Sequence, residues 1–193
     1  MTRAHRTIRR FVYALAVAAT TGAMLLLTPR SAPAHAVPSP CDFTTGGGWV
    51  IIPEEGGDQG NFGIVGGCKN DGFYGHINWV DHNTGLHVNG PVTMYLDPFP
   101  TSDYRDLCGT AKTNDPGNPT VKFRVRTLDV DEPGGLDRFG IALSTGYVVS
   151  TRELGPPGQN GGGGNIQRHK PNPSNTGGPG DESACADDTF LDR

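Results

Sequence analysis

The sequence predicts an all-β domain, an antiparallel β-sandwich or flattened barrel of about nine short strands. No segment after residue 36 shows a sustained apolar period of 3.6 residues, which argues against long helices. The chain contains 29 glycines and 16 prolines, and these residues separate short β-favouring runs from one another.

The clearest predicted strand covers Thr120–Val130, where the apolar residues Val121, Phe123 and Val125 alternate with basic residues. This two-residue period is typical of a sheet with one buried face and one face toward water. Further strands are expected at residues 49–52, 62–65, 73–81, 86–96, 104–112, 138–144, 147–153 and 165–169. Short polar segments at 82–85 and 145–146 predict hairpin loops.

The first 36 residues resemble a secretory signal peptide. They carry arginines and no acid in the first ten positions, then an apolar run at Phe11–Leu27, then Ala34-His35-Ala36. A basic start, an apolar centre and small residues at the end are the three parts of such a signal, and we place the cut after Ala36. The alternative is an uncleaved membrane anchor, for which the run of 17 residues is at the lower limit of length.

Removing residues 1–36 takes away five arginines and no acid, so the formal net charge changes from −4 to −9. Such a surface repels phosphate groups, so we expect no nucleic-acid partner and contact with a membrane only through the signal peptide. The rest of the chain divides into a secreted β domain at 37–170 and a flexible Gly/Pro/acidic tail at 171–193. The tail is tethered only if Cys185 is bridged.

All four cysteines lie after the signal peptide. An even number of cysteines in an exported chain predicts two disulfides. Sequence alone leaves three connectivities open, and we favour Cys68–Cys108 in the core with Cys41–Cys185 joining the two ends. A zinc site is the weaker alternative because no two cysteines have C-x-x-C spacing.

Three polar residues, His76, Asn78 and His82, share one face of the predicted strand at 73–81 and its end. Because side chains alternate along a strand, Trp79 takes the opposite face together with the apolar Ile77 and with Asp81. We therefore expect Trp79 to be buried, and we expect the same of Trp49 in its own strand.

The last predicted strand has a similar polar face, which we place beside the first. The resulting candidate site for a carbohydrate or other polar ligand comprises His76, Asn78, His82, His87, Asn165, Gln167 and His169. Clustered imidazoles also suit zinc or copper. The alternative is a network of satisfied polar groups that fixes the strand order.

A second candidate site is the acidic turn formed by Asp129, Asp131, Glu132 and Asp137. Hard oxygen ligands around a glycine turn suit calcium, which is the candidate cofactor for this turn. The segment does not match the twelve-residue helical calcium loop, so the alternative is an acidic surface turn shaped by its Pro-Gly pair.

The sequence identifies no catalytic residue. It contains no G-x-S-x-G motif, and oxidised cysteines have no nucleophilic thiolate. The glycine run at Gly161–Gly164 lacks the lysine and hydroxyl residue of a phosphate-binding loop. The acid pair Glu54-Glu55 lies among glycines, as in a solvated loop.

Several motifs occur in an order that is typical of one family. They are Thr45–Trp49, Asn61–Gly63, Gly75–His82, Glu132-Pro133-Gly134 with Asp137 and Phe139, Gly146-Tyr147, and Gly163–Gln167 with His169. Together they resemble the post-choice-of-anchor (post-COAP) domain of bacterial surface and secreted proteins, from Thr45 to Lys170. The resemblance implies an extracellular β domain, often attached to larger surface proteins, with no established activity. Asp131 departs from the family pattern, which usually has glycine there.

These observations favour a non-enzymatic structural or interaction module of a bacterial secreted or surface protein, whose partner is a cell-surface protein or a polysaccharide. The alternatives are a polysaccharide-directed hydrolase and a calcium- or metal-dependent ligand-binding domain. A pocket that gathers two carboxylates would favour the hydrolase.

Overall fold

The computed structural model describes residues 35–52, 57–99, 102–130, 132–155 and 161–190. All of these belong to the unit His35–Arg193. The expected signal peptide, apart from His35 and Ala36, lies outside the described residues, as do Glu54, Glu55 and Asp131. Within the described part, no helix is long and apolar enough to cross a membrane.

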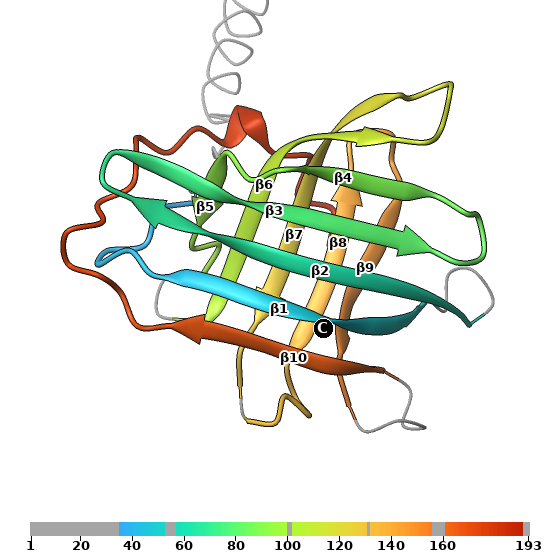
Figure 1. Cartoon of the computed structure of the whole chain (residues 1–193), viewed down its shortest axis with the longest axis horizontal. Coiled ribbons are helices and arrows are strands. Elements are labelled where there is room, and N and C mark those ends of the chain that lie inside the picture. Colours follow the sequence, from blue (N-terminus) through green and yellow to red (C-terminus); the bar gives the residue numbers. More distant parts are fainter. Residues whose placement is uncertain (1–34, 53–56, 100–101, 131, 156–160, 191–193) are drawn as a thin grey trace, which may run out of the picture. The chain divides into compact units, whose positions relative to one another are not determined.

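The described residues form the predicted all-β fold, with ten strands in one antiparallel sheet. The strands are β1 Phe43–Ile52, β2 Asp58–Lys69, β3 Gly72–Asp81, β4 His87–Pro91, β5 Met94–Leu96, β6 Tyr104–Thr113, β7 Thr120–Leu128, β8 Arg138–Leu143, β9 Val148–Glu153 and β10 Gly162–His169. Their order is β10-β1-β2-β3-β4-β6-β7-β8-β9, and β5 pairs with β6. Figure 1 shows β10, β1, β2 and β3 crossing over β6, β7, β8 and β9, so the sheet folds onto itself as a nearly closed barrel.

Three stacked aromatic rings fill the space between the two layers. Phe62 of β2 stacks on Phe139 of β8 with ring centroids 4.0 Å apart, and Trp79 of β3 lies 5.6 Å from the same ring. Trp79 is fully buried, as predicted from strand alternation. Gly60 makes room for it, because a Cβ at that position would come within 2.0 Å of the indole.

The prediction that Trp49 is buried was wrong. Val50 and Ile52 face the core, so the two-residue period turns Trp49 to the outer face of β1, where it is only half-buried. Its indole lies over Gly163 of the neighbouring strand β10, at a distance that leaves no space for a Cβ.

Two disulfides are present, as predicted, but the favoured pairing was wrong. The bonds are Cys41–Cys68 and Cys108–Cys185, with Cα–Cα distances of 5.8 and 4.8 Å. The strand order explains this result. Cys41 precedes β1 next to the end of β2, where the N–H of Cys68 donates to the carbonyl of Asp42, whereas β3 and β4 separate β2 from β6 in the sheet.

The acidic turn between β7 and β8 covers the free edge of β10. The backbone N–H of Ile166 donates to Asp137 Oδ2 at 2.8 Å, and that of Arg168 donates to Asp129 Oδ2 at 2.7 Å. Residues two apart on an edge strand point their N–H groups in the same direction. The carboxylates of Asp137 and Asp129 therefore accept two successive outward-pointing N–H groups of β10. The side chains thus replace a missing neighbouring strand.

The segment after β10 is tethered by Cys108–Cys185 and packs on β6 and β7. The expectation that the basic residues of β7 face water was wrong for two of the three. Arg124 and Arg126 are buried, whereas Lys122 is exposed. Both guanidiniums bind Asp106 of β6, and Arg126 lies between the rings of Phe99 and Phe190, 4.9 Å from each centroid.

Candidate functional site

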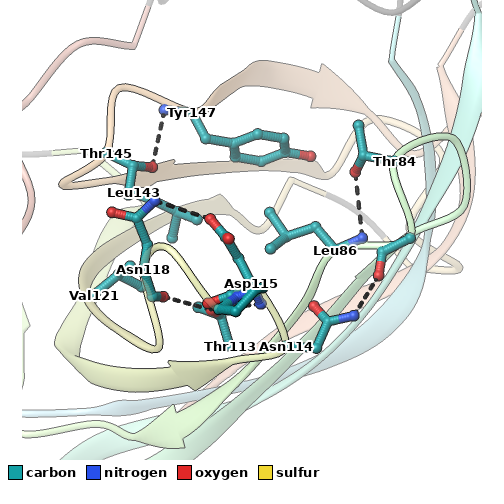
Figure 2. A pocket seen from close by; sticks show the side chains of 12 residues that line it. Thr84, Leu86, Thr113, Asn114, Asp115, Asn118, Val121, Leu143, Thr145 and Tyr147 are labelled. Carbon is teal, nitrogen blue, oxygen red and sulfur yellow. Dashed lines mark hydrogen bonds between the residues drawn. The ribbon is translucent and has the colours of Figure 1, made fainter.

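A pocket of about 440 Å³ opens at the end of the unit where three hairpin loops meet. The loops join β3 to β4, β6 to β7 and β8 to β9, and Figure 2 shows their side chains facing a common space. The pocket is lined by Thr84, Gly85, Leu86, Thr113, Asn114, Asp115, Pro116, Asn118, Val121, Leu143, Thr145 and Tyr147.

The topology brings these loops together. In an antiparallel sheet, successive strands run in opposite directions, so every second connection lies at the same end. The β3–β4, β6–β7 and β8–β9 connections lie at one end of the sheet. The connections between them, from β4 through β5 to β6 and from β7 to β8, lie at the other end. The order and direction of the strands therefore place the three loops at the same end of the sheet.

Asp115 is the carboxylate of the pocket wall. Its Oδ1 accepts the N–H of Gly117 at 2.8 Å, and its Oδ2 accepts the amide of Asn118 at 2.9 Å. The hydrogen bond from Asn118 is the largest cause that holds the pKa of Asp115 below its usual value, followed by the bond from Gly117. The loop thus presents a stable negative charge to the pocket (Figure 2).

Asn114 joins two of the three loops. Its Nδ2 donates to the carbonyl of Gly85 at 2.8 Å, and its Oδ1 accepts the N–H of His87 at 2.8 Å. One amide therefore fixes the β6–β7 loop against the β3–β4 loop and keeps the pocket open at a defined width.

Four lining residues offer apolar surface: Leu86, Val121, Leu143 and the ring of Tyr147, and Figure 2 shows Leu86 reaching toward that ring. The Tyr147 hydroxyl donates to Asp81 Oδ2 at 2.8 Å and accepts the indole N–H of Trp79 at 3.2 Å. The core thus fixes the orientation of this pocket tyrosine.

Asp81 also holds the β3–β4 loop. Its Oδ1 accepts the backbone N–H groups of Asn83 at 2.8 Å and Thr84 at 3.2 Å, while its other oxygen binds Tyr147. Asp81 is fully buried. A buried carboxylate is stable only when its oxygens are satisfied, so these bonds couple the rim of the pocket to the core.

The predicted polar face exists, but its members lie in separate places. His76, Asn78, His82 and His87 are exposed on β3, β4 and their loop. β1 and β2 lie between β3 and β10, which separates the polar faces of β3 and β10 by roughly 14 Å at normal strand spacing.

The polar side chains on the outer face of β3 and its end form separate hydrogen-bonded pairs with neighbouring strands. Asn78 accepts the amide of Asn89 at 3.4 Å, and His82 Nε2 lies 2.9 Å from Asn61 Oδ1. On the other side, His169 of β10 stacks on Phe43 at a centroid distance of 4.2 Å. The partly buried Asn165 and the exposed Gln167 share the face of β10 with His169.

The geometry gives no support to a metal site at the predicted histidines. Among the residues that the structure describes, the group with metal-ligand spacing is His35, Asp106 and Asp188, whose ligand atoms lie within 4.8 Å of one another. Asp106 there already binds Arg124 and Arg126 with both oxygens, and two guanidiniums beside a cation are repulsive.

The acidic turn uses its described carboxylates internally. Asp137 accepts the N–H groups of Val130 at 2.9 Å and Ile166 at 2.8 Å, and Asp129 accepts that of Arg168. Glu132 accepts the amide of Asn165 at 3.4 Å. These carboxylate oxygens accept hydrogen bonds from the turn and from the edge of β10. The bonds bind each carboxylate to a different partner and do not gather them around a common point.

The pocket residues were missed in the sequence, although two of the three loops were predicted as hairpins. The signal that locates the pocket is that every second connection lies at the same end of the sheet, combined with at least one of Asn, Asp and Thr in each of the three loops. The fold and the pocket define a disulfide-bonded antiparallel β domain with a small pocket of mixed polar and apolar lining at one end. The chain matches no family model, no curated protein and no solved structure.

Proposed function

We propose that the protein is an exported, non-enzymatic interaction module that binds an uncharged, hydroxyl-rich ligand, such as a sugar unit of a cell-surface polysaccharide, in the hairpin pocket. The signal-like N-terminus and the two disulfides support an extracellular location. The resemblance to post-COAP domains supports the same class of protein.

The observation that carries the proposal is the composition of the pocket wall. Ligand sites combine an apolar surface with a few fixed polar groups. Here Leu86 and Tyr147 supply apolar surface, while Asp115 and Asn118 supply an acceptor and a donor at the rim. A sugar ring has matching features, with C–H groups on its faces and hydroxyls at its edge.

The same wall supports binding rather than hydrolysis. A glycosidase of the usual type needs two carboxyl groups about 5–9 Å apart across the scissile bond. Among the residues that line the pocket, Asp115 is the one acid, and the nearby Asp81 is buried behind Tyr147.

The experiment that tests the proposal is a titration of the exported protein with oligosaccharides released from bacterial cell-surface polysaccharide, followed by NMR shifts and calorimetry. Thr145→Trp should fill the pocket and weaken binding at least tenfold, about 1.4 kcal/mol. Asp115→Asn should weaken binding less, because it removes the charge and keeps the shape.

Asn89→Ala is the matched control, because Asn89 is exposed on the outer face of β4 and lies outside the pocket. Its affinity should equal that of the unmodified protein. If Asn89→Ala loses binding while Thr145→Trp keeps it, the ligand occupies the polar outer face and the pocket proposal is wrong. If no oligosaccharide binds, the proposed ligand class is wrong.

A further inference from the structure

The folded unit includes His35 and Ala36, which the sequence assigned to the signal peptide. The carbonyl of Ala36 accepts the N–H of Asp97 at 2.7 Å in a β-bridge. The backbone N–H of His35 donates to Glu182 Oε1 at 2.9 Å, and the His35 side chain is only 16% exposed. A cut after Ala36 would remove all of these contacts.

The His35 side chain lies in a cluster of charged groups between β6, β7 and the C-terminal segment. We call it the tail ion cluster, and its members are Asp106, Arg124, Arg126, Glu182 and Asp188.

His35 Nδ1 lies 3.0 Å from Arg124 Nη1 and 2.9 Å from Glu182 Oε1. A neutral ring therefore accepts from the guanidinium, and a protonated ring donates to the carboxylate. His35 Nε2 lies 3.7 Å from Asp188 Oδ2. The imidazole thus has partners on both sides of its ring.

The tail ion cluster has three carboxylates and two guanidiniums, so its own charge is −1. Asp106 and Arg126 are almost fully buried, and buried charges are costly unless they are balanced. One further positive charge beside Glu182 would neutralise the cluster. The backbone nitrogen of His35 has the right position for it, 2.9 Å from the Glu182 carboxylate.

We propose that the signal peptide is removed between Ala34 and His35 and that the new α-ammonium group of His35 completes the tail ion cluster by pairing with Glu182. In the hydrolysis, water adds its oxygen to the carbonyl carbon of Ala34, the peptide C–N bond breaks, and the His35 nitrogen is protonated. Small residues, Ala32 and Ala34, occupy the third and first positions before this bond, as cleavage of such signals requires.

This inference rests on the proposal that the protein is exported. The first test expresses the complete chain with its own leader in a bacterial secretion host and determines the N-terminal tryptic peptide of the protein in the medium. We expect it to begin at His35. A start at Val37 overturns the inference and leaves export intact. An uncleaved chain retained in the cell overturns both proposals.

The second test measures the ammonium group directly. Selective acetylation of the α-amino group should lower the Tm of the exported protein by about 2–4 °C, because it removes the positive charge beside Glu182. In Glu182→Gln the same acetylation should have a much smaller effect, because the partner charge is gone.

Glu153→Gln is the matched control. Glu153 pairs with Arg138 on an exposed strand end and lies outside the tail ion cluster. Acetylation should lower the Tm of Glu153→Gln as much as that of the unmodified protein. An equal effect of acetylation in the Glu182 and Glu153 variants would overturn the proposed ion pair.

Discussion

The carboxylate of Asp137, in the turn just before β8, accepts the backbone N–H of Ile166 in β10 at 2.8 Å. β8 and β10 lie at distant positions in the sheet order, so this side chain links two parts of the sheet that are not neighbours in the strand ladder. The acidic turn thus has a structural role in protecting an edge strand.

Asp137→Asn should destabilise the protein by about 1–3 kcal/mol. The carboxylate accepts N–H groups from both Val130 and Ile166, whereas an amide has one oxygen and would direct its NH₂ group at a donor. Urea unfolding measures the loss, and hydrogen exchange should show faster exchange of the Ile166 amide. Asp71→Asn, in the exposed β2–β3 turn, is the control and should change neither quantity. Unaltered protection of Ile166 in Asp137→Asn would contradict the assigned role.

Trp79→Ala should cost about 3–5 kcal/mol through the cavity that it leaves between the layers. The variant also removes the N–H donor to the Tyr147 hydroxyl. His82→Ala, on the exposed side of the same strand end, should change stability by less than about 0.5 kcal/mol. Denaturant unfolding of both variants makes the comparison. Normal stability of Trp79→Ala would show that its burial does not support the fold.

Peptide mapping without reduction should recover Cys41 and Cys68 in one tryptic peptide, because no Lys or Arg lies between them. Cys108, in the peptide Asp106–Lys112, should be cross-linked to the peptide that carries Cys185. The alternative pairing Cys68–Cys108 would instead link the first two peptides to each other.

The two disulfides should differ in their contributions to stability. They close sequence separations of 27 and 77 residues. Loop-closure entropy gives about 3.5 kcal/mol for Cys41–Cys68 and about 4.5 kcal/mol for Cys108–Cys185. Replacing each pair by alanines and measuring urea unfolding tests the order. A larger loss for the Cys41–Cys68 pair would show that packing around the bonds outweighs loop length.

The protein should lose stability as the pH rises above about 10, the ordinary pKa of tyrosine. Burial raises the pKa of Tyr95 well above that value, and the negative charge of Asp42 adds to the rise. The folded state therefore keeps a proton that the unfolded chain releases, and the free energy of unfolding falls with pH in this range. Urea unfolding between pH 7 and 11 measures the slope.

Tyr95→Phe should flatten this alkaline slope while costing about 1–3 kcal/mol at pH 7, because the hydroxyl bonds to Asp42 and Thr44. Tyr74→Phe is the control. Its phenol is only partly buried and its pKa is raised less, so its removal should change the slope less. Equal slopes for the two variants would contradict the assignment to Tyr95.

Side-chain alternation predicted the faces of β3 correctly, because Ile77 and Trp79 alternate with the polar residues His76 and Asn78. It failed at Trp49, where the three preceding glycines have no side chains to mark the period. The disulfide pairing needed the strand order, which depends on contacts between distant segments. The pocket was missed for the same reason, since Asn114 and Tyr147 meet only after the hairpins are placed side by side.

Because the pocket wall is divided among three separate hairpin loops, its chemistry can change one loop at a time. The Cys41–Cys68 bond lies near the β2–β3 turn, at the opposite end of β3 from the pocket. A new residue at Asn118 or Thr145 would alter what the pocket holds without touching the aromatic stack. The lining at these two positions can therefore be varied separately from the Tyr147–Asp81 contacts that join the pocket to the core.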